Sequence, residues 1–141
     1  MSKMAGIFVN ENGCVHYAEL IVSGIKTIET RNRNMLKSLV GQRVAIVKTR
    51  RKKNPMVVGY VDITGSCFCP INMYEQYREK TCVLEGSIYD VHGKGKWFYY
   101  LENPEACDKF PLPKDAVRHG LSWCEYDDPN YEIWTTTYHN N

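Results

Sequence analysis

The chain has 141 residues, of which 43% are hydrophobic and 24% charged, with a formal net charge of +2. This composition is typical of a folded protein and excludes a disordered chain, and the length predicts one domain spanning residues 1–141. The longest apolar stretches, such as residues 44–47, are far shorter than the roughly 20 residues of a membrane-spanning helix, and no secretory leader follows Met1, so we expect a cytoplasmic protein without a membrane partner.

The first predicted elements are a short helix and a strand. Within residues 16–23, Tyr17, Leu20 and Ile21 fall on one helical face, and Gly24 stands where a glycine often ends a helix. From residue 25 to residue 33, β-branched residues alternate with polar ones. This alternation predicts a half-exposed strand.

Two further strands are predicted on either side of a basic turn. Residues 43–48 form a mostly apolar run typical of a buried strand, and residues 56–64 return after the turn at residues 50–55. Gly59 lies inside the second of these strands. An interior glycine often marks a bulge or a bend at which a sheet curls.

A helical segment and an aromatic strand are predicted next. Pro70 opens the helical segment, in which Ile71, Tyr74 and Tyr77 are apolar at near-helical spacing. A loop with three glycines separates it from residues 96–102, the most aromatic predicted strand. We expect the Asn-Pro pair at residues 103–104 to end that strand.

Two extended stretches, residues 121–126 and 131–138, are predicted to follow a proline-containing loop at residues 110–113. Five or six strands with one or two short helices indicate a mixed α/β, mainly β fold. We expect a small curled sheet or β-barrel with short helices over its openings.

Positive charge is concentrated in one part of the chain. Between Lys26 and Lys53 lie ten basic residues and one acidic residue, Glu29, a local balance of +9, so the remainder carries −7. A concentrated positive field attracts phosphates whatever the net charge. The alternative for the basic turn is a solvated hairpin tip that only raises solubility.

The six cysteines are expected to be thiols, because no secretory signal places the chain in an oxidising compartment. The pair Cys67 and Cys69 is the nearest approach to a metal motif, but no second pair of closely spaced ligands accompanies it. We therefore expect no metal and no cofactor.

One segment carries a resemblance to a known family. Residues 24–31 read Gly-Ile-Lys-Thr-Ile-Glu-Thr-Arg and follow the first predicted helix. A helix followed by Gly-x-Lys-Thr-x-Glu-x-Arg resembles the opening of the ASCH domains, and residues 59–63, 97–104 and 110–111 resemble later ASCH elements in the same order. The resemblance covers residues 14–124 and implies a PUA-like β-barrel, related to RNA-binding modules, in which the shared segment lines a cleft.

The resemblance implies two kinds of activity. Some ASCH members are small bacterial acetylcytidine amidohydrolases, and others are ribonucleases. Lys26 matches the lysine of the amidohydrolase pattern, but Glu29 stands where that pattern has threonine. The remaining catalytic glutamate there comes from a later helical insertion, for which this chain offers Glu75, Glu79 and Glu85 with no spacing that selects one. Glu29 instead matches the ASCH branch ending in Glu-x-Arg, for which ligand binding is implied.

Strand geometry sets a condition on this site. In a regular strand Glu29, Arg31 and Arg33 face one way and Lys26 the other. Lys26 therefore joins Glu29 only if the chain just after Gly24 is not yet regularly pleated. Such a site would offer a carboxylate acceptor, a compact cation and a planar fork of donors, which suits the polar edge of a nucleobase together with its phosphate.

We accordingly predict a protein that binds RNA or a modified nucleoside. The ligand-binding residues are Lys26, Glu29, Arg31 and Arg33, and the phosphate-binding residues are Lys48, Arg50, Arg51, Lys52 and Lys53. The alternative is a small metal-independent hydrolase of acylated nucleosides or RNA, in which a desolvated Lys26 attacks a carbonyl or activates water and Glu29 moves protons. There are two further, non-catalytic alternatives. One is a structural ion pair, and the other is a basic surface that binds an acidic protein partner.

Overall fold

The computed structural model describes residues 3–11 and 13–131. Their elements are β1 (Lys3–Asn10), α1 (Tyr17–Val22), β2 (Ile28–Arg31), the 3-10 helix η1 (Lys37–Leu39), β3 (Arg43–Thr49), β4 (Met56–Pro70), the 3-10 helix η2 (Ile71–Tyr77), α2 (Arg78–Thr81), β5 (Gly95–Pro111), β6 (Val117–His119) and β7 (Trp123–Asp127). The seven strands form one sheet in the order β2-β5-β4-β3-β1-β7-β6. No helix among these residues is long and apolar enough to span a membrane.

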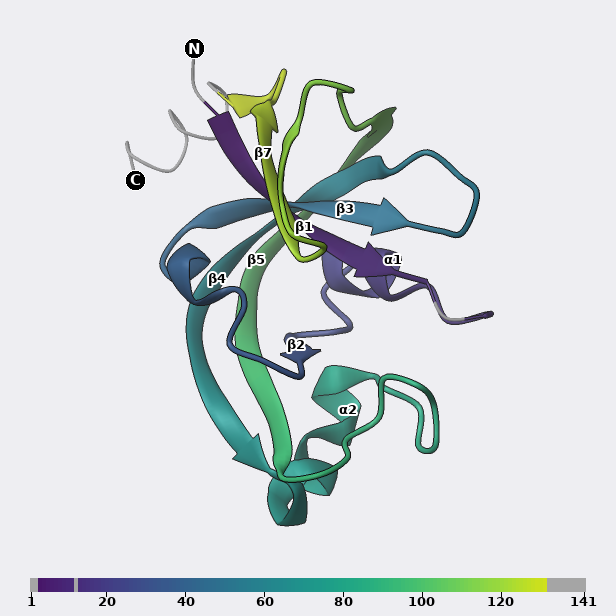
Figure 1. The fold of residues 1–141 in the computed structure, drawn as a ribbon, viewed down its shortest axis with the longest axis vertical. Helices are drawn as coiled ribbons and strands as arrows, with labels where there is room; N and C mark the ends of the chain where they lie inside the picture. The colour runs from purple at the N-terminus through teal and green to yellow at the C-terminus, as the bar shows by residue number, and fades with distance from the viewer. Residues whose placement is uncertain (1–2, 12, 132–141) are drawn as a thin grey trace.

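The sheet is curled, as expected, around two long strands. Figure 1 shows β4 and β5 side by side as bent ribbons, with η2 and α2 at their lower end. The register between these two strands shifts three times, and each irregularity bends the pair. Strands β2 and β6 are the edges of the hydrogen-bonded order in the described residues, so the sheet curls without a hydrogen-bonded closure.

The expected end of the aromatic strand at Asn103 and Pro104 is wrong, because β5 continues to Pro111. Asn103 adopts a left-handed φ of 52°, and the register with β4 shifts between Tyr60 and Asp62 at the same place. Proline has no backbone N–H to donate and is tolerated in a sheet at such a bulge. The Asn-Pro pair therefore bends β5 and does not end it.

The first strand of the sheet was not among the predicted elements. β1 pairs in parallel with β3 and antiparallel with β7, so it lies between them in the sheet. The apolar run at residues 5–9 is the signal for such a buried strand. The other expected elements have their counterparts in α1, β2 to β5, η2 with α2, and β7, whereas the expected stretch at 131–138 lies outside the described residues beyond Tyr131.

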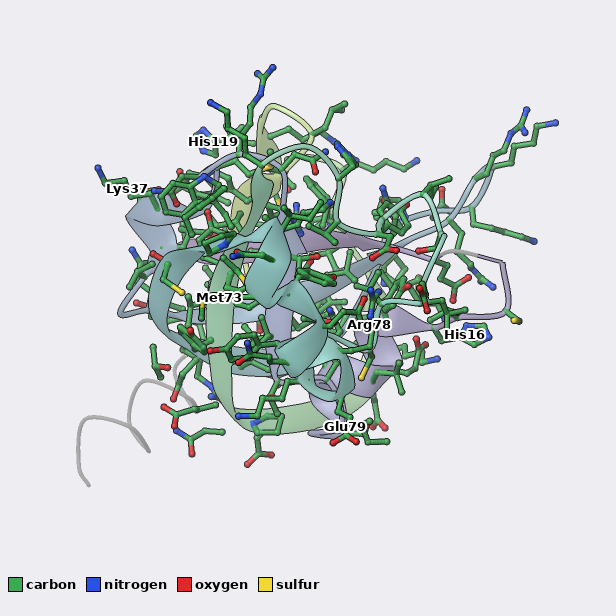
Figure 2. All side chains as sticks on the ribbon, turned by 90° about the horizontal axis from the view of Figure 1, so that it is seen from below. His16, Lys37, Met73, Arg78, Glu79 and His119 are labelled. Carbon is green, nitrogen blue, oxygen red and sulfur yellow. The ribbon has the colours of Figure 1, made fainter. Side chains whose placement is uncertain are left out.

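The main core lies between α1 and the sheet. Tyr17, Ala18 and Ile21 of α1 are buried against Val58 and Val61 of β4, in one cluster. A separate cluster of Ile28, Cys69, Tyr74 and Phe98 joins β2, β4 and β5 to η2. The helical segment η2–α2, which carries Met73, Arg78 and Glu79 in Figure 2, therefore covers the lower end of the sheet. All six cysteines are free thiols.

Gly59 is a point of close approach between α1 and the sheet. A β-carbon at this position would lie 2.3 Å from the carbonyl oxygen of Glu105 and 2.6 Å from Cγ1 of Val22. The backbone oxygen cannot move without disturbing the pairing of β4 with β5. Only glycine therefore fits between the helix and the bulged strand pair.

The Gly59→Ala variant is expected to lower the free energy of unfolding by about 1–3 kcal/mol, because the added methyl group overpacks the core. Denaturant unfolding measures this change. Gly65→Ala is the matched control in the same strand, since its β-carbon would meet only Cδ2 of Tyr100, at an ordinary 3.6 Å. Equal losses at the two positions would contradict the close approach of α1 at Gly59.

Candidate functional site

The turn after α1 brings the Lys26 side chain close to the start of β2. Gly24 has a φ of +83°, and the N–H groups of Ile25 and Lys26 both donate to the carbonyl of Leu20. These bonds hold the chain in a tight turn, and β2 begins only at Ile28. Lys26 therefore precedes the regular pleat, and the condition for its joining Glu29 is met.

The ammonium group of Lys26 is buried and surrounded by acceptors. Its Nζ donates to the carbonyl oxygens of Ile28 at 2.8 Å and Thr81 at 2.5 Å, and lies 3.5 Å from Oε1 of Glu29. The Lys26 side chain is 2% exposed. Three acceptors match the three hydrogens of an ammonium group. Burial lowers the pKa of Lys26, and Glu29 offsets this only in part.

Glu29 and Arg31 form a second, tighter pair. Arg31 Nη2 donates to Oε2 of Glu29 at 2.9 Å and to the carbonyl of Phe8 at 2.7 Å, while Nε also donates to Oε2, at 3.2 Å. The Arg31 guanidinium thus links the edge strand β2 to β1, across the curled sheet. Burial raises the pKa of Glu29, but Arg31 and Lys26 outweigh it, so the pKa lies below its ordinary value of 4.5.

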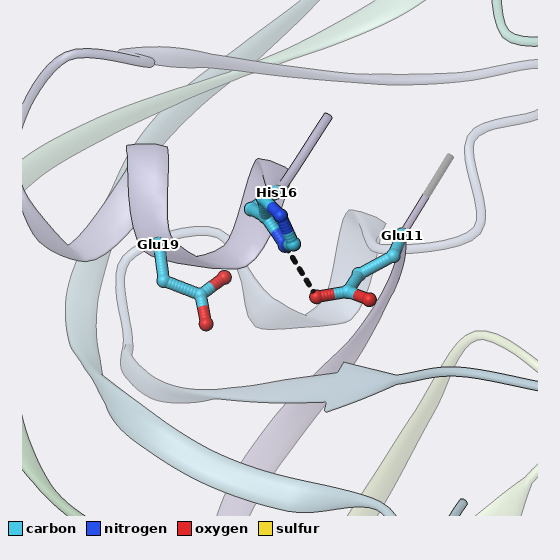
Figure 3. Close-up of side chains that lie close together, drawn as sticks. All are labelled: Glu11, His16 and Glu19. Carbon is cyan, nitrogen blue, oxygen red and sulfur yellow. Dashed lines mark hydrogen bonds and ion pairs between the residues drawn. The ribbon is translucent and has the colours of Figure 1, made fainter. Parts of the chain in front are cut away.

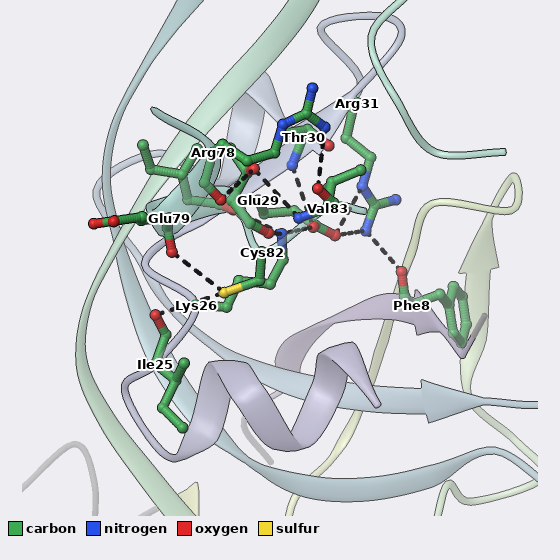
Figure 4. Close-up of polar contacts among 12 residues, drawn as sticks. Phe8, Ile25, Lys26, Glu29, Thr30, Arg31, Arg78, Glu79, Cys82 and Val83 are labelled. Atoms are coloured by element: carbon green, nitrogen blue, oxygen red, sulfur yellow. Dashed lines mark hydrogen bonds and ion pairs between the residues drawn. The ribbon is translucent and has the colours of Figure 1, made fainter. Parts of the chain in front are cut away.

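These three side chains line a common cavity. Figure 4 shows Lys26, Glu29 and Arg31 directed towards one another, with the carbonyl of Phe8 beside the guanidinium. The cavity has a volume of about 110 Å³ and is lined by Phe8, Val9, Asn10, Tyr17, Lys26, Glu29, Thr30, Arg31, Val83, Tyr89 and Leu121. The lining thus combines charged and polar groups with an apolar wall of aromatic and aliphatic side chains.

Two tyrosines that the sequence did not mark as site residues contribute to the apolar wall. The rings of Tyr17 and Tyr89 meet edge to face with their centroids 6.0 Å apart, and Lys26 Nζ lies 5.3 Å from the centre of the Tyr17 ring. Tyr17 belongs to α1, whereas Tyr89 lies in the loop between α2 and β5. The wall therefore joins segments that are distant in the sequence.

The loop that carries Tyr89 is held in place by an ion pair. Arg78 Nη1 donates to Oδ1 of Asp90 at 2.7 Å and to the carbonyl of Val83 at 3.0 Å. The Asp90 carboxylate also accepts from the N–H groups of Gly86 and Val91. This network fixes both Val83 and Tyr89 at the cavity, because Arg78 binds the loop close to each of them.

Other predicted site residues lie elsewhere. Arg33 is exposed after the end of β2 and is not part of the cavity lining. The three glutamates of the helical insertion are not part of it either. Glu75 pairs with Arg78, while Glu79 and Glu85 are exposed. Among the described residues, Glu29 is the carboxylate that lines this cavity.

The basic hairpin is divided into two parts. Lys48 is buried, with its Nζ 2.6 Å from Glu11 and 2.5 Å from Glu19. Burial alone would lower the pKa of Lys48, but the two carboxylates raise it. Arg50 lies 3.6 Å from Glu11. The structure therefore separates Lys48 from the exposed tip, which consists of Arg51, Lys52 and Lys53.

The acidic residues around Lys48 are close to one another and to a histidine. Figure 3 shows His16 bonded to Glu11, with Glu19 beside them, and one potential ligand atom from each lies within 4.8 Å of the others. The Lys48 ammonium already occupies the space between the two carboxylates. This cluster is therefore an ion-pair network that joins α1 and β3 to Glu11, the residue that follows β1.

Comparison with solved structures identifies the fold. No protein-family model and no curated protein matches the sequence. The crystal structure of ASCH from Zymomonas mobilis matches with a TM-score of 0.71 and 19% identity, over 94% of this chain and 94% of that one. A serine-to-alanine variant of that protein matches with a TM-score of 0.70 and 19% identity, over 95% of each chain. A tyrosine-to-phenylalanine variant gives a TM-score of 0.70 and 20% identity, over 94% of this chain and 96% of that one.

The chain is therefore a small, mainly β protein whose curled sheet and short helices enclose a charged cavity. Its fold is that of the ASCH structures from Zymomonas mobilis, and the expectation drawn from residues 24–31 is confirmed at the level of the fold.

Proposed function

We propose that this protein binds RNA or a modified nucleoside by accepting one nucleobase in the cavity formed by Lys26, Glu29 and Arg31. The observation that carries this proposal is the fixed pair of a carboxylate and a guanidinium on one wall of a cavity of about 110 Å³. A cavity of about 150 Å³ holds a benzene ring. The volume here is smaller than that, so the cavity admits the edge of one planar heterocycle and leaves the rest of the ligand outside.

The polar groups of the cavity suit the edge of a base. A nucleobase edge presents both donors and acceptors, and Glu29 accepts while Arg31 donates. A bare phosphate would need only the cations. Tyr17 and Tyr89 on the apolar wall supply aromatic surface, and contacts between bases and aromatic rings contribute about 1–3 kcal/mol each.

Lys26 serves this function by its charge. Its hydrogens are directed to two carbonyl groups and to Glu29, so the ammonium fixes the carboxylate and stabilises its ionised form. This arrangement keeps Glu29 an acceptor at neutral pH, because the pKa of Glu29 is held below its ordinary value of 4.5.

Calorimetric titration with the four common ribonucleosides, with acetylated nucleosides and with a short single-stranded RNA tests the proposal. Ribose, which lacks a base, is the control ligand. We expect ligands with a base to bind and ribose not to bind. If no base-containing ligand binds, or if ribose binds equally well, nucleobase recognition is excluded.

The exposed hairpin tip is proposed to attract the phosphates of RNA without base specificity. If an RNA strand binds along Arg51, Lys52 and Lys53, exchanging all three for glutamine should reduce the slope of log affinity against log salt by about 0.7 for each phosphate that the tip no longer neutralises. The control variant exchanges three other exposed lysines, Lys37, Lys80 and Lys94, for glutamine. A hairpin variant whose salt slope equals that of the control would exclude a role for the tip.

A metal-independent hydrolase of acylated nucleosides or RNA is the second candidate function. It is favoured by the buried Lys26, whose pKa is lowered by burial and whose ammonium lies 3.5 Å from Glu29 in the cavity. A lysine of this kind acts as a nucleophile after losing its proton, and a neighbouring carboxylate transfers protons. The two carbonyl acceptors of Lys26 oppose that loss, since they bind the ammonium form.

Product analysis separates the two candidates. Incubation with acetylated nucleosides and labelled RNA yields acetate or shorter fragments only if the protein is a hydrolase, whereas a binding protein returns the ligands unchanged. Turnover that survives in the Lys26→Ala variant would exclude Lys26 as the catalytic group.

A further inference from the structure

Two aromatic side chains lie on the sheet beside the cavity. The rings of Phe68 in β4 and Trp97 in β5 meet edge to face, with their centroids 5.6 Å apart and their planes at 69°. Phe68 is 40% exposed, and Trp97 is partly exposed. Neither of them lines the cavity of Lys26, Glu29 and Arg31, so the proposed base site does not use them.

The register of the sheet places this aromatic pair in one row with Arg31. Trp97 is the partner of Arg31 in β2 and also of Phe68 in β4, and residues directly opposite each other on antiparallel strands have their side chains on one face. Glu29 and Tyr99, the pair two positions away, share that face. The row therefore runs from Arg31 at the cavity across Trp97 to Phe68, over three neighbouring strands spaced about 4.8 Å apart.

The Phe68 ring is held in place although much of its surface is exposed. A β-carbon at Gly95 would lie 3.0 Å from Cζ of Phe68, so the phenyl ring lies close to the backbone at the start of β5. Trp97 contacts the same ring edge to face. A ring that is fixed before binding loses little conformational freedom when a ligand packs against its exposed surface.

The charges at the Arg31 end of the row suit a polyanion. Nη1 of Arg31 has no hydrogen bond to the described residues, because the bonds of this guanidinium use Nε and Nη2. Arg33, two residues further along the chain, is exposed. Single-stranded nucleic acids bind surfaces that combine aromatic rings with cations, since bases stack on the rings and the cations attract the phosphates. The combination therefore favours a nucleic acid strand over an uncharged partner.

We propose that Phe68 and Trp97 form a stacking platform for a second base, next to the base in the cavity. This inference rests on the proposed function, since the first base occupies the cavity and the phosphate between the two bases lies towards Arg31 and Arg33. The ligand is then a single RNA strand of at least two nucleotides, and not a free nucleoside. A duplex does not suit the platform, because its bases already stack on one another.

The Phe68→Leu variant tests the platform, because leucine keeps an apolar side chain and removes the aromatic face. Calorimetric titration compares the four common ribonucleosides with short single-stranded RNAs of adenylate, cytidylate or uridylate. We expect the variant to lose about tenfold in affinity for the RNA that the wild type binds best, and to bind nucleosides as the wild type does. The slope of log affinity against log salt should not change, because Phe68 carries no charge.

Tyr77→Leu is the matched control. Tyr77 of η2 is partly exposed and meets Phe98 edge to face at 5.3 Å, but Phe98 faces the opposite side of β5 from Trp97. Each variant removes one ring from an edge-to-face pair, so we expect similar decreases in melting temperature and a loss of RNA affinity in Phe68→Leu alone. Unchanged RNA affinity in Phe68→Leu, or an equal loss in Tyr77→Leu, would overturn the platform.

The outcomes also separate this inference from the proposed function. Nucleosides that bind, together with RNA affinity that does not depend on Phe68, would overturn the platform and leave the base cavity intact. RNA that binds through Phe68 while no nucleoside binds would support the platform and contradict recognition of a base in the cavity. If Phe68→Leu weakens nucleosides and RNA equally, Phe68 acts on the cavity itself and the platform is overturned.

Discussion

The Glu29→Ala variant is expected to lose about 3–5 kcal/mol of unfolding free energy, the largest effect expected of a single substitution in this protein. Glu29 is the shared counter-charge of Lys26 and Arg31, at 3.5 Å and 2.9 Å. Its removal leaves the buried Lys26 and the part-buried Arg31 without an acid. Chemical denaturation monitored by circular dichroism measures the loss.

Glu79→Ala is the control, because Glu79 is exposed and its carboxylate has no partner among the described residues. We expect this variant to remain within about 0.5 kcal/mol of the wild type. A double variant that combines Lys26→Met with Glu29→Gln should lose less than the sum of its single variants, since the residues are in contact. A Glu29→Ala variant as stable as Glu79→Ala would show that the buried pairs do not support the fold.

The same carboxylate predicts a dependence of stability on pH. Because the pKa of Glu29 in the folded protein lies below its ordinary value of 4.5, the folded state binds fewer protons than the unfolded state in that range. The stabilisation by Glu29 is therefore complete above pH 4.5 and is lost as the pH falls through the lower pKa of the folded state. Thermal unfolding between about pH 3 and pH 6 should show a smaller decline in Glu29→Gln than in the wild type.

The second large effect is expected at Arg31. Lysine at this position keeps a positive charge but loses the planar fork that binds Glu29 and the Phe8 carbonyl together. We expect Arg31→Lys to weaken binding of base-containing ligands by about 10–100-fold, which corresponds to about 1.4–2.7 kcal/mol. Calorimetry with the ligand that the wild type binds best measures the change.

Arg33→Lys is the matched control for this substitution, because Arg33 lies two residues further on, is exposed and is not part of the cavity lining. It should bind as the wild type does. Equal affinities of the Arg31→Lys and Arg33→Lys variants would mean that the fork of Arg31 does not contact the ligand.

Local patterns predicted most elements of the fold. The helical spacing before Gly24 and the apolar run at residues 43–48 correspond to α1 and β3, because both depend on the periodicity of neighbouring residues. The long course of β5 through Asn103 and Pro104 was not predictable in this way. Whether a proline ends a strand or bends it depends on the partner strand, and here β4 shifts its register at that point.

The candidate site was predictable in part. Lys26, Glu29 and Arg31 stood out because they lie within six residues, and Gly24 indicated the turn that lets them converge. Tyr89 carried no such signal, since its approach to the site depends on the loop after α2. The burial of Lys48 was missed for the same reason, because Glu11 and Glu19 lie far from it in the sequence.

The central claim is that the pair of Glu29 and Arg31 recognises a base in the cavity beside Tyr17 and Tyr89. A crystal structure of the protein soaked with the best-bound nucleoside or nucleotide tests it most directly. We predict density for a planar ring within hydrogen-bonding distance of the Glu29 carboxylate and the Arg31 guanidinium. A ligand bound elsewhere on the protein, with this cavity holding only water, would contradict the claim.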